Sequence, residues 1–192
     1  MTPEEVHDHL VAIREVVDRA REERVRHSDM FVVWGIVLVC CTMATLAGDA
    51  VGWPWGWVTY PVLGSIAAGW TAWTAWGRGL RHDTYGGRIE GTAWASVVVG
   101  LVVLLLGGLT SGVLPLEAIT PIVSVLAGVA LTVAGAIYRT WVLAGSGWAF
   151  IGLALPCFFL PWQAQYALFA VALVFGYVVP GLVLMRRERR AV

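Results

Sequence analysis

The sequence predicts an all-α integral membrane protein with six transmembrane helices in three outward-turning hairpins, preceded by a cytoplasmic amphipathic helix. Three observations predict this fold class. First, 58% of the residues are hydrophobic and only 14% are charged, whereas a soluble domain carries roughly 25% charged residues. Second, six apolar stretches are each long enough to cross a bilayer. Third, all the arginines fall on one side of a six-helix arrangement.

The composition also excludes several classes of protein. So many apolar residues do not fit inside one soluble core of this size, which excludes an ordinary soluble enzyme, a disordered chain and a nucleic-acid binder with a basic surface. The 13 basic residues balance the 13 acidic residues, so net charge indicates no partner. Cys40, Cys41 and Cys157 lie in apolar runs without metal-ligand spacing, so we expect buried thiols, no metal and no cofactor.

Residues 1–29 are predicted to form the cytoplasmic amphipathic helix. Thr2 and Glu5 fit a capping box, and Pro3 suits the first helical position. An apolar stripe with heptad spacing follows, and it contains Val6, Leu10, Ile13 and Val17. Three partners stay open for this stripe: a second copy of the chain, the chain's own loop 77–91, or another protein. Binding to the membrane surface is disfavoured because anionic lipid would repel the eight acidic residues of this segment.

Residues 30–185 are predicted to form the six-helix transmembrane domain. A span needs about 20 apolar residues, because the hydrocarbon core is about 30 Å thick and a helix rises about 1.5 Å per residue. The candidate spans are residues 30–47, 58–76, 92–114, 118–138, 140–160 and 162–185. Pro54, Pro115 and Pro161 lie in the outer connections, and Pro180 predicts a kink near the end of the sixth span.

The arginines predict the orientation of these spans. All 13 lie before the first span, between the second and third, between the fourth and fifth, or after the sixth. The other side carries only Asp49 and Glu117. By the positive-inside rule both termini are cytoplasmic, including the basic tail 186–192, and the chain is a multi-pass protein of the inner (plasma) membrane. The bilayer is therefore its expected partner, and nucleic acid is not.

Tryptophans lie near both ends of the predicted spans. An outer group comprises Trp53, Trp55, Trp57 and Trp162, and aromatic belts are expected at both interfaces. A second group comprises Trp70, Trp73 and Trp76. Its spacing of three residues places it on one helical face, either as an interfacial and packing stripe or as a candidate site for a cationic or apolar ligand.

No catalytic motif is recognisable. HExxH, GxSxG and Walker sequences do not occur, and the spans contain essentially no ionisable residue. Asp49 and Glu117 lie at the outer rim, where helix ends explain an acidic residue. We therefore expect no catalytic residues and a protein that is not an enzyme.

A pattern of tryptophan or glycine at the start of an apolar helix, proline at the outer turn and glycines in the return helix resembles the small bacterial six-helix membrane proteins of the HdeD type. The return-helix glycines are Gly64, Gly69, Gly128, Gly135, Gly176 and Gly181. The resemblance covers about residues 30–185, without the charged N-terminal helix. The chain is also similar to other uncharacterised bacterial membrane proteins with such a helix. The resemblance implies an association with acid-stress resistance and supplies no site residues.

These observations predict a non-enzymatic inner-membrane component, stress-related or regulatory, that acts through self-association or a partner. The alternative is a small channel or transporter for an uncharged or cationic small molecule. A polar, solvent-accessible path through the bundle would favour the alternative. A tightly packed bundle with a protruding apolar stripe would favour the non-enzymatic component that acts through self-association or a partner.

Overall fold

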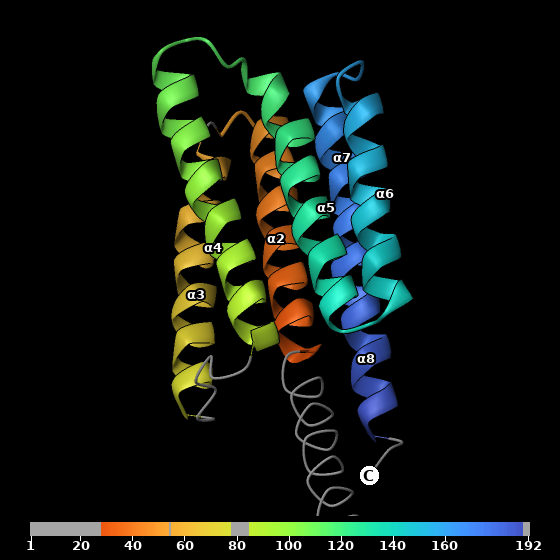
Figure 1. Cartoon of the computed structure of the whole chain (residues 1–192). Helices are drawn as coiled ribbons and strands as arrows, with labels where there is room; N and C mark the ends of the chain where they lie inside the picture. The colour runs from red at the N-terminus through yellow and green to blue at the C-terminus, as the bar shows by residue number, and fades with distance from the viewer. Residues whose placement is uncertain (1–27, 54, 78–84, 190–192) are drawn as a thin grey trace, which may run out of the picture.

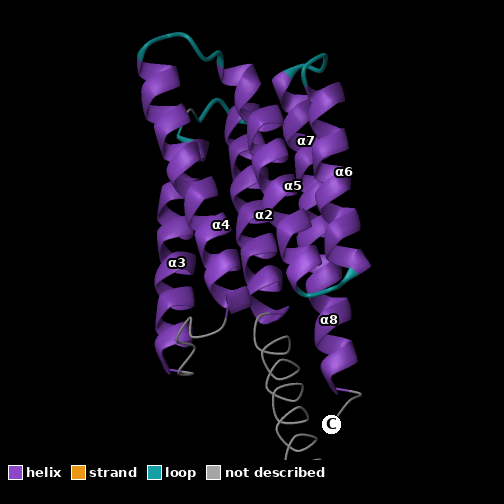
Figure 2. Ribbon diagram, in the orientation of Figure 1, coloured by secondary structure: helices purple, strands orange, loops and turns teal. Residues whose placement is uncertain are grey.

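The computed structural model describes residues 28–53, 55–77 and 85–189. Within these ranges all regular structure is helical and no strand occurs. The long helices run side by side as an upright bundle (Figure 1, Figure 2). The predicted N-terminal stripe of Val6, Leu10, Ile13 and Val17 lies outside the described residues, so its partner remains a prediction.

The helices follow one another with short connections. The first half contains α2 (Ser28–Ala50), the 3₁₀-helix η1 (Gly56–Val58), α3 (Thr59–Gly77), α4 (Tyr85–Val103) and the π-helical turn η2 (Leu104–Leu109). The second half contains the 3₁₀-helix η3 (Leu116–Ala118), α5 (Ile119–Ile137), α6 (Trp141–Cys157), α7 (Trp162–Leu173), the π-helical turn η4 (Val174–Val178) and α8 (Val179–Arg189). We call the end where α2 is joined to α3, α4 to α5 and α6 to α7 the hairpin end.

Four helical stretches are long and apolar enough to cross a membrane. They are Ser28–Ala50, Gly91–Leu109, Leu116–Ile137 and Trp162–Arg186. Their length and composition identify an all-α integral membrane protein. Two further helices lie alongside them: α6, an apolar helix of 17 residues, and α3, of 19 residues. Threonine, tryptophan, glycine and proline residues lower the hydropathy of α3, and it is not among the four.

The most extensive contact in the bundle joins α5 to α6. Glycines make it possible, because a Cβ atom at Gly128 would lie 2.7 Å from the Gly147 carbonyl oxygen. A Cβ at Gly135 would collide with the backbone of Ala144. Small residues at such positions allow two helix backbones to approach closely in a membrane, where van der Waals packing drives association.

A second group of helices packs around α2, which contacts α3, α7, η4 and α8. Gly35 and Gly181 permit this approach, since a Cβ at Gly35 would lie 2.8 Å from the Tyr177 Cβ, and one at Gly181 would lie 2.6 Å from the Val32 Cγ2. By contrast, α4 packs mainly on α5. Therefore α3 and α4 occupy the periphery, each held chiefly by one neighbour.

Two hydrogen bonds between side chains attach α3 to α2. The Trp34 indole N–H donates to the Thr71 hydroxyl at 3.1 Å. The Thr42 hydroxyl donates to the Leu38 carbonyl oxygen at 2.8 Å, so the Tyr60 hydroxyl, 2.9 Å away, is the donor to Thr42. These bonds lie at different levels along the helix pair and fix its register.

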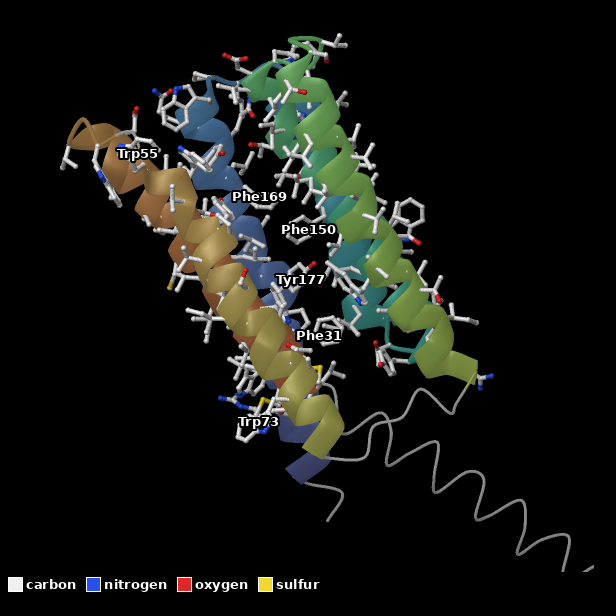
Figure 3. All side chains as sticks on the ribbon, turned by 90° about the vertical axis from the view of Figure 1, so that its left-hand side faces the viewer. Phe31, Trp55, Trp73, Phe150, Phe169 and Tyr177 are labelled. Carbon is white, nitrogen blue, oxygen red and sulfur yellow. The ribbon has the colours of Figure 1, made fainter. Side chains whose placement is uncertain are left out.

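Aromatic side chains fill the centre of the bundle. The Phe150 ring meets the rings of Phe169 and Tyr177 edge-on, at centroid distances of 5.9 and 5.8 Å. The rings of Phe31 and Trp94 each lie at a centroid distance of 6.3 Å from the Tyr177 ring. Figure 3 shows Phe169, Phe150, Tyr177 and Phe31 in succession along the bundle. Because edge-on aromatic pairs are favourable geometries, this cluster joins α2, α4, α6, α7 and η4 into one core.

The expected distortion near Pro180 takes the form of the π-helical turn η4, which ends at Val178. Proline has no N–H to donate to the carbonyl four residues earlier, and its ring clashes with that carbonyl. A wider turn just before Pro180 accommodates both effects. The helix then continues as α8.

Candidate functional site

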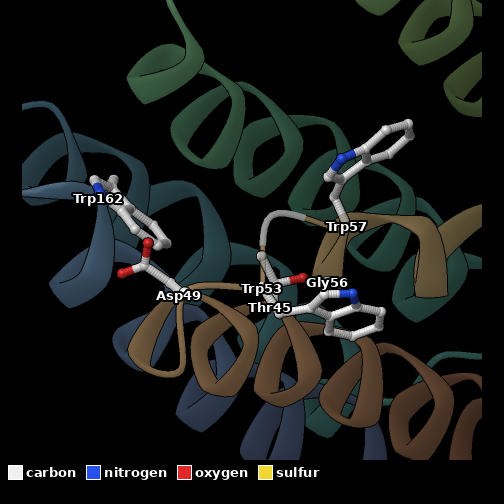
Figure 4. Close-up of a pocket in the computed structure, with 7 residues that line it drawn as sticks. Thr45, Asp49, Trp53, Gly56, Trp57 and Trp162 are labelled. Atoms are coloured by element: carbon white, nitrogen blue, oxygen red, sulfur yellow. The ribbon is translucent and has the colours of Figure 1, made fainter.

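A cavity of about 270 Å³ lies at the hairpin end, between the end of α2, η1 and the start of α7. Figure 4 shows its lining. The residues that form it are Thr45, Asp49, Gly52, Trp53, Gly56, Trp57 and Trp162. Three tryptophans and one aspartate therefore line a single small space that is partly open to solvent.

The way α2 ends places Trp53 in this cavity. Gly52 has a φ of +71°, and its N–H donates to the Asp49 carbonyl oxygen at 3.0 Å. The Trp53 N–H donates to the Gly48 carbonyl oxygen at 2.7 Å. This pair of bonds is a Schellman motif, which ends a helix and reverses the chain. The Trp53 ring then packs over Gly48, where a Cβ would lie 3.4 Å from it.

The segment η1 lies directly on α2 and brings in Trp57. A Cβ at Gly56 would lie 2.8 Å from the Thr45 Cα and 2.9 Å from the Ala44 carbonyl oxygen, so a larger residue does not fit. The Thr59 hydroxyl donates to the Gly56 carbonyl oxygen at 2.7 Å. Because Gly56 is pressed against α2, the next residue, Trp57, is held at the rim of the cavity.

The start of α7 provides the opposite wall. Trp162 is the first residue of α7, and its ring contacts the Tyr166 ring edge-on at a centroid distance of 5.6 Å. Gln165 is only 1% exposed, and its side-chain amide donates to the Leu160 carbonyl oxygen at 2.9 Å. The Gln165 Oε1 is buried without a hydrogen-bond partner among the described residues. Gln165 thus fixes the turn that positions Trp162.

The cavity is acidic. Asp49 is exposed, and among the described residues none donates a hydrogen bond to its carboxylate or pairs with it. The Thr45 hydroxyl is already used, because it donates to the Cys41 carbonyl oxygen at 2.9 Å. Within the described part of the chain, no group of three or more His, Cys, Asp or Glu residues is placed to hold a metal ion. The lining offers aromatic faces and a negative charge, and no nucleophile paired with a base.

A second cavity, of about 400 Å³, adjoins the first and shares Trp53 with it. Its other lining residues are Trp55, Val58, Thr59, Val62 and Leu63. This lining is almost wholly apolar, so it suits a lipid chain or another apolar surface rather than a charged group.

The predicted stripe of Trp70, Trp73 and Trp76 lies elsewhere. Trp73 is 74% exposed and points away from the bundle near the end of α3 opposite to Trp55 (Figure 3). Trp70 is partly buried, and the Trp76 side chain is outside what the structure describes. Neither Trp70 nor Trp73 lines the two cavities, and a role for this stripe in ligand binding or packing stays a prediction.

The sequence alone predicts other roles for the residues of the first cavity. It indicates interfacial aromatics at Trp53, Trp57 and Trp162, and a turn residue at Asp49. Their convergence was not predictable from spacing, because Trp162 comes from a distant segment. A local signal did exist: an acid followed by three alternating tryptophans around Pro54.

Comparison with known proteins adds no family to this description: no protein-family model, curated protein or solved structure matches the chain. The class that the fold defines is therefore an all-α integral membrane protein, and the resemblance to the HdeD type stays a prediction.

Proposed function

We propose that the chain is a non-enzymatic, multi-pass protein of the inner (plasma) membrane, with six spans and both termini in the cytoplasm. Its role is regulatory or stress-related, and it acts through self-association or a partner. The observation that carries this proposal is the closed packing of the bundle centre.

Among the described residues, the bundle centre is apolar and closely packed. Leu131, Leu143 and Leu173 are 0% exposed, and Phe150 is 1% exposed. Among the described residues, several buried hydroxyls donate to carbonyl oxygens of their own helices, which occupies their protons within the helix. The Ser124 hydroxyl, for example, donates to the Thr120 carbonyl oxygen at 2.8 Å. Conduction requires polar groups or water along a path, so this packing favours a component that does not transport over the alternative of a channel or transporter.

Helix length and charge support six spans. At about 1.5 Å per residue, the 19 residues of α3 extend about 28 Å and the 17 residues of α6 about 26 Å, close to the bilayer's hydrocarbon thickness of about 30 Å. Arg139 lies between α5 and α6, and Arg186 lies in α8, both away from the hairpin end. The positive-inside rule then assigns the hairpin end to the outer side.

The peripheral helices support self-association. A Cβ at Gly64 or Gly69 of α3, at Gly100 of α4 or at Gly107 of η2 would meet nothing within 4 Å. Glycines with open space beside them on apolar helices are typical of membrane helix–helix interfaces, because they let a second backbone approach. A second copy of the chain would supply that second helix backbone.

Reconstitution in liposomes tests the proposal. We expect potassium, proton and glycerol fluxes equal to those of protein-free liposomes, measured with potential-sensitive and pH-sensitive dyes and by light scattering. Native mass spectrometry of the same preparation should give a defined oligomer. A flux that rises in proportion to the protein content would overturn the proposal and establish the channel or transporter alternative.

A further inference from the structure

We propose that the hairpin-end cavity is a binding site for a small organic cation with a quaternary ammonium group. This inference goes beyond the proposed function and does not depend on it. It rests on three properties of the cavity: its aromatic walls, its charge and its size.

The aromatic walls come from three separate elements. Trp53 follows the end of α2, Trp57 belongs to η1 and Trp162 begins α7. The face of an indole carries negative electrostatic potential and attracts cations more strongly than other side-chain rings do. Aromatic cages of this kind recognise quaternary ammonium groups, because these cations are large and weakly hydrated and lose little by leaving water.

The negative charge of the Asp49 carboxylate also favours binding of a cation. Asp49 is the cavity's one carboxylate among the lining residues, and in Figure 4 this carboxylate points toward the wall formed by Trp162. The described connections of the hairpin end contain no arginine or lysine to neutralise it. A bound ammonium group would lie between the Trp162 ring and the Asp49 carboxylate and supply the missing positive charge.

Size and polarity separate an organic cation from other ligands. A volume of about 270 Å³ lies just below the range of about 300–1,000 Å³ typical of ligand sites, so the ligand is small. A divalent cation such as Ca²⁺ needs about six to eight oxygen ligands, and the side chains that line this cavity offer only the Asp49 carboxylate and the Thr45 hydroxyl oxygen. A sugar would need more polar partners than these.

The quaternary ammonium group has two natural sources, a free solute and the choline headgroup of a lipid. Both present the same chemistry to the cavity. The apolar second cavity beside Trp53 is placed to take an acyl chain in the lipid case. The experiment below distinguishes the two.

The probe is tetramethylammonium chloride, added to the full chain in neutral maltoside micelles. Saturation-transfer NMR of its methyl protons measures binding, with sodium chloride at equal ionic strength and empty micelles as references. We expect saturable binding with a Kd of about 1 mM, because the site is partly open to solvent and each contact is weak.

Matched variants locate the site. We expect Asp49→Asn to weaken binding about fivefold, as loss of a solvated charge pair predicts. Trp162→Leu should weaken it by a similar factor. Two controls should bind like the unmodified chain: Glu117→Gln, which removes the other outer acid, and Trp141→Leu, which removes an exposed tryptophan at the opposite end. Unchanged thermal unfolding by circular dichroism shows that each variant is folded.

Phosphatidylcholine added to the micelles identifies the source. If the lipid headgroup occupies the cavity, it competes and raises the apparent Kd of tetramethylammonium; if the ligand is a free solute, the Kd does not change. Either result supports the site. Equal binding by Asp49→Asn and Glu117→Gln, or no saturable binding by the folded protein, overturns it.

Discussion

Gly147 of α6 lies directly against Thr132 of α5, so closely that a Cβ at position 147 would overlap the Thr132 hydroxyl oxygen. That hydroxyl donates to the Gly128 carbonyl oxygen at 2.8 Å and cannot move without losing its bond. The most extensive helix contact of the bundle therefore depends on glycine at position 147 as well as at positions 128 and 135.

The first prediction concerns this contact. Gly147→Ala should lower the free energy of unfolding by about 1–3 kcal/mol, because overpacking forces side chains and backbone apart. Circular dichroism during thermal or SDS unfolding in detergent measures the change. Gly145→Ala is the matched control, since a Cβ at that position meets nothing within 4 Å. Equal destabilisation by both variants would contradict the close contact.

The second prediction concerns Arg139, which has a φ of +50°. It occupies the left-handed position of a Schellman motif, with the Thr140 N–H donating to the Gly135 carbonyl oxygen at 2.9 Å. Glycine adopts this conformation without steric cost, so Arg139→Gly should stabilise the protein by about 0.5–1 kcal/mol. Arg139→Ala removes the same charge and keeps the strain. If Arg139→Ala also stabilises the protein, the loss of positive charge explains the effect, and relief of backbone strain does not.

The third prediction is the orientation of the spans. In a cysteine-free background, Arg81→Cys and Arg187→Cys should react with a membrane-impermeant maleimide only from the cytoplasmic side, and Asp49→Cys only from outside, because arginines are retained in the cytoplasm. The background is necessary because Cys40 is exposed. Labelling of position 81 from outside would exclude the six-span arrangement.

The fourth prediction concerns the N-terminal stripe. Leu10→Asp and Ile13→Asp place a charge in an apolar heptad seam. We expect a change in oligomer mass if a second copy covers the stripe, or faster hydrogen exchange in residues 77–91 if the chain's own loop does. Glu15→Gln, a change off the stripe, should alter neither. If the Asp variants also leave both unchanged, self-association and loop docking are excluded, and the stripe has a partner outside this chain or no partner at all.

The positions of the helices were largely predictable from the sequence, because hydropathy and helix-ending residues act locally. The first span was expected over residues 30–47, and α2 extends slightly beyond it at both ends. The third was expected to continue to residue 114, but the helix ends at Leu109. Gly112, with a φ of +70°, ends it earlier because the turn to α5 requires a left-handed residue there.

The cavity was not predictable in the same way. Asp49 and Trp53 meet because of a local turn, which the glycines around them signal. Trp162 joins them only through the packing of α7 against α2. The chain continues from α7 into η4, which also packs on α2 through residues far apart in the sequence, such as Gly35 against Tyr177. The hydropathy pattern of a single helix does not predict such a contact.

The attachment of α3 to α2 has a consequence for how the protein enters its membrane. An isolated helix with the composition of α3 gains little by leaving water, since hydroxyls and indole N–H groups are costly in hydrocarbon when unpaired. Tyr60 and Thr71 find their partners on α2, at Thr42 and Trp34. During biosynthesis, α2 and α3 would therefore leave the translocon as a pair. The hydrogen-bonding groups of α2 would then replace the water that the polar side chains of α3 lose.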